Sequence, residues 1–344
     1  MTDLAGARVL VLGGTVFVGR AFVELALGQG AHVTTFNRGQ SGDDVVGVDT
    51  VRGDRTNADD LAGLAKLGHF DMVVDMSPQV PAHIVASTRA LANTVDAYVV
   101  VSSLSAVAQW GQVPCFPDSP RNPNDPDATE APDYSEAKSG VEVAAIRELG
   151  DKAAIIRPGV IAGPYERIGR LPWWLTYVHD HDLVIAPGRD TTPYQAIDVR
   201  DLAQALAISG VRTAAGDNPG IVHAIAPAGR DTLGDLVTYC ADTVGGRHEL
   251  VWVDDATVVA AEVVPWDGFP QWLPESEPEF PYAMLADDAS FAALGIVARP
   301  LEETVADTWA WMQAGGQWNH PDSRLSEAQY ELLRAGLETD LTLS

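Results

Sequence analysis

The hydrophobic positions of the chain form short apolar runs that alternate with longer segments of helical periodicity. The runs have the length of buried strands and cover residues 8–12, 32–36, 72–75, 97–101 and 153–156. Segments with the length and pattern of amphipathic helices lie between them, at residues 17–28, 59–67, 81–95 and 134–149. This alternation predicts an α/β fold, a doubly wound parallel sheet with helices on both faces. Ligands of such sheets bind at the carboxyl ends of the strands.

The alternation loosens after about residue 163, where prolines and tryptophans become frequent, and the stretch 263–281 is loop-like and aromatic. We interpret this part as a smaller lobe that follows a sheet core. The expected division is a core of 1–162 to which 191–225 returns, a lobe of 163–190 and 226–316, and a C-terminal helical appendage of 317–344.

Composition narrows the classes of partner. Of the 344 residues, 48 are acidic and 22 are Lys or Arg, which gives a formal net charge of −26. This charge repels nucleic-acid phosphates and anionic membrane surfaces, and it favours a small-molecule substrate. The two cysteines imply no disulfide framework. With no basic, apolar leader and no membrane-length apolar run, we expect a cytoplasmic protein.

The segment VLVLGGTVFVGR, residues 9–20, has the form of a strand that enters a glycine-rich turn and then a helix. A dinucleotide loop uses glycines for the tight turn, for the approach to the pyrophosphate and for close packing of the helix. Gly13 and Gly14 suit the first two purposes and Gly19 suits the third. Val16 stands where a further glycine would be expected, so on these residues alone an ordinary strand–turn–helix stays open.

The end of the next strand, TTFNRG at 34–39, offers Asn37 and Arg38 and no acid before Asp43. An acid at this place binds the ribose hydroxyls of NAD, whereas an arginine accommodates the 2′-phosphate of NADP. We therefore expect NADP, with NAD as the alternative. Asp54, in RGDRTN at 52–57, could accept a hydrogen bond from the adenine amino group.

A candidate catalytic pair follows in PDYSEAKSG, residues 132–140. Tyr134 and Lys138 are four residues apart, so a helix would place them on one face. A nearby ammonium would lower the pKa of the phenol and make it a usable acid/base. The serines of VVVSSLSAVAQ, residues 99–109, follow a predicted strand and could hold the substrate oxygen.

Together these motifs resemble the extended, atypical short-chain dehydrogenase/reductases of the NAD-dependent epimerase/dehydratase family, in the branch whose loop reads GGTxFxG. The resemblance runs through almost the whole chain and includes GGTVFVG (13–19), FNRG (36–39), GDR (53–55), SSLS (102–105), YSEAK (134–138), RPGVIAGP (157–164) and QAIDVRDLA (195–203). It implies a Rossmann-type sheet. In this branch the central glycine is commonly replaced, so Val16 marks the subgroup.

The resemblance implies roles for individual residues. Tyr134 would be the acid/base, Lys138 would bind the nicotinamide ribose and tune Tyr134, and Ser103 would be the catalytic serine, with Ser102 and Ser105 as competitors. The implied cofactor-binding residues are Gly13, Gly14, Thr15, Phe17, Val18, Gly19, Asn37, Arg38, Asp54, Arg55, Lys138 and Pro158. The implied substrate-binding residues are Ser105, Arg167, Arg170, Gln195 and Trp272, although the lobe tryptophans could equally form its core.

The expected reaction is NADP(H)-dependent hydride transfer at a secondary alcohol or ketone of a polar metabolite, a nucleotide sugar being one possibility. Reduction is favoured over epimerisation. Dehydration is disfavoured, because Leu104 and Ser105 replace the Asp–Glu pair of family dehydratases. The alternatives are a stem-loop RNA-binding protein of the same branch and a non-catalytic NADP-binding regulator. HDHD at 179–182 resembles a metal cluster, but we expect no metal there; a homodimer is expected only by analogy.

Overall fold

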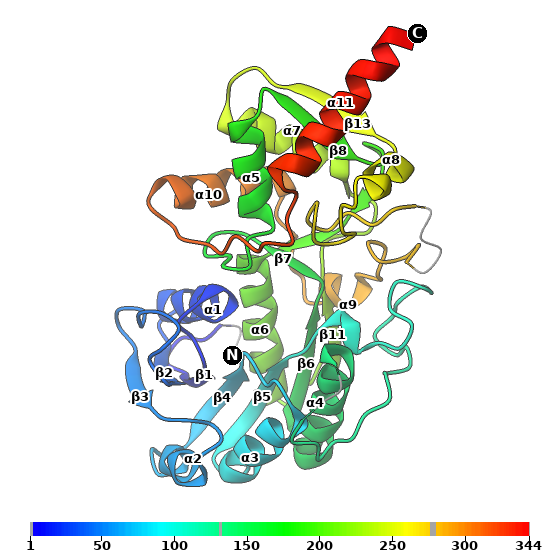
Figure 1. Ribbon diagram of the computed structural model, residues 1–344. Coiled ribbons are helices and arrows are strands. Elements are labelled where there is room, and N and C mark those ends of the chain that lie inside the picture. Colours follow the sequence, from blue (N-terminus) through cyan, green and yellow to red (C-terminus); the bar gives the residue numbers. More distant parts are fainter. Residues whose placement is uncertain (1–2, 131–132, 276–279, 344) are drawn as a thin grey trace.

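The computed structural model describes residues 3–130, 133–275 and 280–343, without the side chains of 338–343. A layered sheet domain forms its lower part in Figure 1, and a smaller lobe lies above it. Residues 276–279 of the predicted aromatic loop and residues 131–132 fall outside the described ranges. No helix of the described part is long and apolar enough to cross a membrane.

The sheet has seven strands in the order β11-β6-β5-β4-β1-β2-β3, and all six pairings are parallel. This order reverses its direction at β1 and β4, as in dinucleotide-binding sheets. The predicted doubly wound sheet is therefore confirmed. The strands are β1 (Arg8–Leu12), β2 (His32–Asn37), β3 (Asp49–Arg52), β4 (Phe70–Asp75), β5 (Val95–Val101), β6 (Ala153–Pro158) and β11 (Ile221–Ala224).

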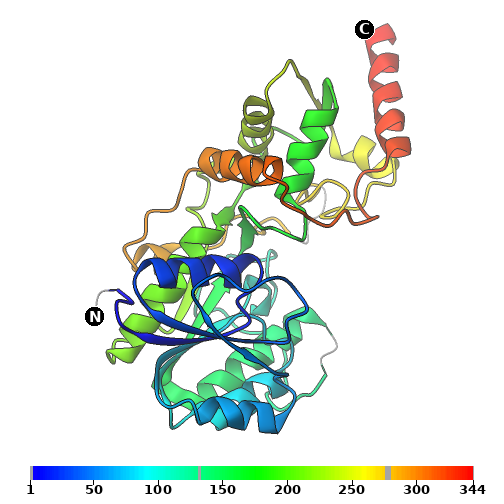
Figure 2. The same cartoon turned by 90° about the vertical axis from the view of Figure 1, so that its left-hand side faces the viewer.

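Helices cover both faces of the sheet because its central strands send apolar side chains to both sides. One face packs against α1 (Phe17–Gly28) and α6 (Val199–Ala214). The other packs against α2 (Ala58–Ala65), α3 (Pro81–Leu91) and α4 (Tyr134–Leu149). Figure 2, turned by 90°, shows α1 and α2 on opposite sides of the strands. Burial of these two apolar layers stabilises the domain and fixes where each strand ends.

One predicted helix is too long. The segment 81–95 was expected to be helical throughout, but α3 ends at Leu91 and Val95 already pairs with Phe70 in β5. The backbone N–H of Thr94 donates to the Leu91 carbonyl oxygen at 2.8 Å, which closes a turn after the helix. The following residues are needed to complete the strand beside β4.

The lobe has its own apolar core, built around Trp174, Phe269 and Trp272. Its elements are α5 (Leu171–Asp180), β8 (Leu183–Pro187), α7 (Leu233–Val244), β13 (Glu249–Val253), α8 (Asp255–Ala260), α10 (Leu301–Gln313) and α11 (Glu327–Leu343). Two short strand pairs lie where the chain passes between the lobe and the sheet. They are β7 (Val160–Ala162) with β10 (Ala196–Asp198), and β9 (Pro193–Tyr194) with β12 (Asp231–Thr232).

Two segments lie differently from the expected division of the chain. The region around α9 (Ala289–Ala292) was assigned to the lobe, yet Phe291, Leu294 and Ile296 are buried in the cluster under the sheet. The C-terminal helix is joined to the lobe, since the Tyr330 hydroxyl donates to the Leu183 carbonyl oxygen at 2.9 Å and Leu333 lies in the lobe core. In both segments, a few apolar side chains among polar ones are buried, and these side chains fix where the segment packs.

Candidate functional site

The glycine-rich loop between β1 and α1 adopts a backbone that explains its sequence. Gly13 and Gly14 have φ angles of 119° and 101°, a region that residues with side chains avoid. A Cβ atom at Gly19 would lie 2.8 Å from the Gly14 nitrogen, so α1 could not pack against the loop. Val16 has φ −137° and ψ 151°, ordinary extended backbone. The replaced glycine is thus no obstacle to the loop conformation.

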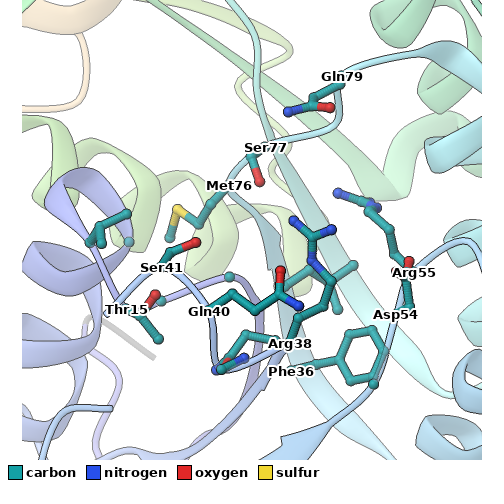
Figure 3. A pocket seen from close by; sticks show the side chains of 18 of the residues that line it. Thr15, Phe36, Arg38, Gln40, Ser41, Asp54, Arg55, Met76, Ser77 and Gln79 are labelled. Carbon is teal, nitrogen blue, oxygen red and sulfur yellow. The ribbon is translucent and has the colours of Figure 1, made fainter. Parts of the chain in front are cut away.

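This loop forms one wall of a cavity of about 630 Å³ at the carboxyl ends of β1, β2 and β3 (Figure 3). Every predicted cofactor residue between 13 and 55 lines it. The remaining two, Lys138 and Pro158, line an adjoining cavity of about 990 Å³. Phe17, Val18 and Met76 line both cavities, so the two form one long site across the point where the strand order reverses. Its extent and glycine-lined wall fit a dinucleotide.

Asp44 and Arg52, two charged residues that contact the cavity residue Asn37, are engaged with each other. Asn37 donates to an Asp44 carboxylate oxygen at 3.0 Å and accepts a hydrogen bond from Arg52, which also pairs with Asp44. Burial opposes ionisation of Asp44, but Arg52 and Asn37 hold its pKa below the usual value. Within the described residues, no hydrogen bond or ion pair engages the Arg38 guanidinium. Sequence reasoning missed Asp44, which lies beyond the motif.

Arg55 leads to a buried polar network under the same cavity. Its guanidinium pairs with both carboxylate oxygens of Asp75, a fully buried residue at the end of β4. The Tyr98 hydroxyl donates to Asp75 at 2.9 Å and lies 2.8 Å from the Ser87 hydroxyl. Figure 3 shows the guanidinium groups of Arg38 and Arg55 both reaching toward the middle of the cavity. Arg55 is therefore neutralised, whereas Arg38 is available to an anion.

The second cavity brings the three predicted catalytic residues together. Helix α4 begins at Tyr134, where the Asp133 side chain accepts a hydrogen bond from the Glu136 backbone N–H and caps the helix. Tyr134 and Lys138 therefore share one wall of the cavity, and Ser103 follows β5 on the neighbouring wall. The Lys138 Nζ atom lies 5.6 Å from the centre of the Tyr134 ring. Tyr134 is 60 % exposed and lines this cavity, so it remains open to a ligand.

The expected pKa effect of Lys138 on Tyr134 is not present. Lys138 Nζ donates to the Val101 and Pro78 carbonyl oxygens at 3.1 and 3.3 Å, which turns it from the phenol. The pKa of Tyr134 is raised, because loss of hydration outweighs the Ser103 hydroxyl and the charge of Arg170. The pKa of Lys138 itself is lowered to about 8, chiefly by burial.

The three candidate serines differ in what they contact. The Ser102 hydroxyl is buried and donates to a Glu142 carboxylate oxygen at 2.6 Å. The Ser103 hydroxyl oxygen accepts from the Ser105 hydroxyl at 2.9 Å and from its N–H at 3.2 Å. Ser103 and Ser105 thus form a small polar pair in the cavity, and Ser102 belongs to the framework behind it.

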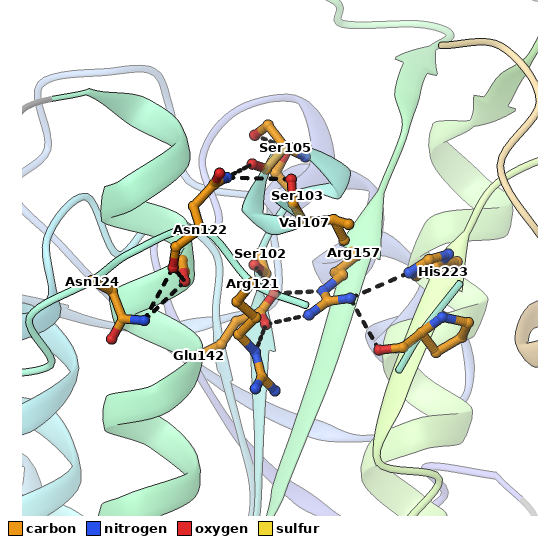
Figure 4. A network of polar contacts seen from close by, with 12 residues as sticks. Ser102, Ser103, Ser105, Val107, Arg121, Asn122, Asn124, Glu142, Arg157 and His223 are labelled. Atoms are coloured by element: carbon orange, nitrogen blue, oxygen red, sulfur yellow. Dashed lines mark hydrogen bonds and ion pairs between the residues drawn. The ribbon is translucent and has the colours of Figure 1, made fainter. Parts of the chain in front are cut away.

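That framework is a buried ion cluster between α4, β5 and β6 (Figure 4). Both carboxylate oxygens of Glu142 accept from Arg157, at 2.8 and 2.7 Å, and one also accepts from Arg121 at 2.7 Å. Glu142 and Arg157 are fully buried. Arg157 also reaches His223, whose pKa falls to about 4 through burial and the Arg157 charge. The cluster ties the end of β5, which carries Ser103, to the helix of Tyr134.

The predicted substrate residues are dispersed. Ser105, Gln195 and Arg170 line the second cavity, but the Gln195 amide is held by the backbone of Ala226 and Ala286. Arg167 lines neither cavity and donates instead to the Ser41 carbonyl oxygen. Trp272 is only 1 % exposed and its Nε1 atom donates to Asp255 at 3.0 Å. Trp272 is therefore part of the lobe core and is not among the residues that line either cavity.

The HDHD segment spans the end of α5 and the turn before β8. His179 Nδ1 lies 2.8 Å from an Asp180 carboxylate oxygen, while His181 Nδ1 lies 2.8 Å from the Tyr177 carbonyl oxygen. The two imidazoles thus have separate partners. The side chains that sequence reasoning missed are Trp110, Ile168, Trp266 and Met284, which line the second cavity from loops that carry no motif.

Comparisons with known proteins agree with this geometry. Residues 9–224 match the model of the NAD dependent epimerase/dehydratase family. Among curated proteins none matches the sequence significantly. A putative epimerase from Burkholderia cenocepacia has a similar structure, with a TM-score of 0.68, 17 % identity and coverage of 90 % of this chain and 99 % of the other.

Two structures solved with ligands match this chain over the same share of its length. UDP-glucose 4-epimerase of Thermotoga maritima, solved with UDP-glucose, has a TM-score of 0.65 at 16 % identity. The Bordetella bronchiseptica enzyme WbmH, solved with NAD+, has a TM-score of 0.65 at 19 % identity. Each comparison covers 90 % of this chain and 99 % of the other. At these identities the likeness establishes the fold.

Proposed function

The chain belongs to the NAD dependent epimerase/dehydratase family, and from this premise we propose that it is an NADP(H)-dependent oxidoreductase that reduces a ketone to a secondary alcohol, or catalyses the reverse reaction. The observation that supports this most directly is the single long cavity. It joins the glycine-rich loop and Arg38 at one end to Ser103, Tyr134 and Lys138 at the other.

The proposed chemistry follows from the side chains of the second cavity. A reduced nicotinamide held at Lys138 and Pro158 would supply a hydride, and thus two electrons, for the carbonyl carbon of the substrate. Tyr134 donates its hydroxyl proton to the carbonyl oxygen and regains a proton from solvent, so the products are the alcohol and the oxidised cofactor. Ser103 holds the same oxygen. The raised pKa of Tyr134 keeps the phenol protonated before the reaction, as reduction requires.

Lys138 is assigned to the cofactor in this scheme. With a pKa near 8 it is mainly protonated at neutral pH, and its ammonium would bind the ribose hydroxyls of the nicotinamide nucleotide, the other role expected of it. Nζ has two carbonyl partners, so a ribose hydroxyl that replaces one of them would keep it bonded. Leu104 and Ser105 offer no second acid–base pair after Ser103, which disfavours dehydration.

The cofactor preference is proposed from the charges around β2. Within the described residues no hydrogen bond or ion pair engages the Arg38 guanidinium, and a 2′-phosphate would accept charge-assisted hydrogen bonds from it. Asp44, the acid that follows the motif, is already held by Arg52 and Asn37. Arg38→Ala should raise the Kd of NADPH about tenfold to a hundredfold and leave that of NADH nearly unchanged. Arg147→Ala, on the outer face of α4, is the control.

The catalytic assignment is tested by Tyr134→Phe. Loss of the proton donor should reduce kcat by about a hundredfold to ten-thousandfold, measured as oxidation of NADPH with a ketone panel. The Kd of NADPH, measured by calorimetry, should change less than about threefold because the ring is retained. A variant with undiminished kcat would refute the role of Tyr134, and a wild-type protein that binds neither NADPH nor NADH would refute the function.

A further inference from the structure

The part of the second cavity away from the glycine-rich loop is largely apolar. Its apolar lining side chains are Trp110, Ile161, Ile168, Trp266, Ala283 and Met284. They come from the loop after β5, from β7, from the segment that leads to α5 and from two segments of the lobe. Outside the wall that carries Ser103 and Tyr134, Gln195 and Arg170 also line the cavity, and both side chains are held by protein partners. A substrate that reaches the phenol therefore leaves much of its remaining surface against hydrocarbon and indole.

Trp110 and Trp266 form the centre of this wall. They are far apart in sequence, yet their rings meet edge to face with centroids 5.9 Å apart and an interplanar angle of 86°. Both depend on left-handed backbone, at Gln109 (φ 58°) and at Trp266 itself (φ 70°). Non-glycine residues adopt this conformation only where surrounding contacts impose it, and such residues concentrate at ligand sites.

The surrounding contacts that impose it can be identified. The Trp266 backbone N–H donates to the Trp272 carbonyl oxygen at 2.7 Å, and Trp272 is buried in the lobe core. On the other side, the Tyr282 N–H donates to the Gly111 carbonyl oxygen at 2.8 Å and holds the Trp110 loop against the lobe. The two indoles are thus placed by the fold, in advance of any ligand.

The charged side chains of the cavity also favour an uncharged ligand. The cations that line it are Lys138, at the end expected to hold the nicotinamide, and Arg170. Arg170 is neutralised by Glu166, at 2.9 Å, and also donates to the Ile161 carbonyl oxygen at 3.1 Å. Glu166 is fully buried. Among the described residues that line the cavity, a nucleoside diphosphate would find no arginine without an acidic partner, and bringing its charge from water would be strongly unfavourable.

We propose that the Trp110–Trp266 wall selects an uncharged ketone or secondary alcohol that carries an apolar ring, and that the site excludes nucleoside diphosphates. The proposal rests on the proposed function. It differs from the polar metabolite that the sequence motifs led us to expect. The ring lies against the two indoles, and the carbonyl oxygen points toward Ser103 and Tyr134.

The test compares two probes on the NADP+-loaded protein by calorimetry: 2-tetralone, an uncharged bicyclic ketone, and UDP-glucose. We expect saturable binding of 2-tetralone and none of UDP-glucose. Trp110→Ala and Trp266→Ala should each raise the Kd of 2-tetralone about tenfold or more. Trp309→Ala, which alters a tryptophan outside both cavities, should leave it unchanged. If an alanine variant unfolds, Trp110→Phe and Trp266→Phe replace it and should show a smaller rise.

The outcomes separate this inference from the proposed function. Saturable binding of UDP-glucose, failure of 2-tetralone to bind, or an unchanged 2-tetralone Kd in both tryptophan variants would each overturn the inference, while NADPH binding and the dependence of turnover on Tyr134 stay intact. Failure to bind either nicotinamide dinucleotide would instead overturn the function on which it rests.

Discussion

The buried ion cluster around Glu142 provides the sharpest test of how this fold holds its site. Glu142 and Arg157 have no exposed surface, and the carboxylate accepts hydrogen bonds from Arg157, Arg121 and Ser102. In Glu142→Gln the side chain keeps its shape but loses its charge, and an amide NH2 group would face the Arg157 donors. Arg157 would then be a buried cation without a counter-ion, since it lies in β6 and cannot reach water.

Breaking a buried pair by removing one partner costs about 3–5 kcal/mol. We place Glu142→Gln in this range because both partners are fully buried and are joined by two hydrogen bonds. Arg121, which is partly exposed, can rehydrate and adds little. Glu24→Gln on α1 removes the exposed pair of Glu24 with Arg20 and should cost less than about 1 kcal/mol.

The assay is urea unfolding at neutral pH, followed by circular dichroism, for wild type, Glu142→Gln, Glu24→Gln and the double variant Glu142→Gln/Arg157→Met. The double variant removes the orphaned charge and should recover about 2 kcal/mol or more relative to Glu142→Gln. A loss below about 1 kcal/mol in Glu142→Gln, equal to that of Glu24→Gln, would refute the reasoning.

The pH dependence gives a second readout of the same cluster. Burial alone would raise the pKa of Glu142, but the hydrogen bonds and charge of Arg157 lower it below the ordinary 4.5. A carboxylate with a lowered pKa in the folded state stabilises the protein above pH 4.5, and this stabilisation is lost as the pH falls through the folded-state pKa. The stability gap between wild type and Glu142→Gln should therefore narrow on acidification below about pH 4.5.

Two further predictions concern the cofactor loop and the catalytic lysine. Gly19→Ala places a Cβ atom 2.8 Å from the Gly14 nitrogen, so calorimetry should show NADPH binding weakened by about tenfold or more, whereas Gly28→Ala, with open space around it, should not change it. Lys138→Met should abolish turnover and alter the pH dependence of stability. The pKa of Lys138 is about 8 in the folded protein and 10.5 in the unfolded chain, so the unfolded chain binds more protons between these two pH values. As the pH rises through this interval, wild type should therefore gain about 2–3 kcal/mol of stability relative to the variant. Parallel stability curves for the two proteins in alkaline urea titrations would contradict the buried-ammonium account.

The amino-acid sequence by itself determined most elements of the sheet domain and the residue types at their ends. Helices 17–28 and 134–149 match α1 and α4 residue for residue, because periodicity and terminal residues such as Asp133 act within a few positions. The glycines of the first loop, and the four-residue spacing of Tyr134 and Lys138, are local signals as well. They sufficed to predict the parallel sheet and to indicate the cavity at its edge.

Tertiary structure decided how those groups are used. In the folded chain Lys138 donates to two carbonyl oxygens, and the Ser102 hydroxyl donates to Glu142 while Ser103 lines the cavity. Trp272 lies in the lobe core. The fold also brought Trp110 and Trp266 into contact. These outcomes depend on burial and on partners distant along the chain, which set pKa, charge pairing and access to ligand. Periodicity carries no information about such partners, because it records only which face of an element avoids water.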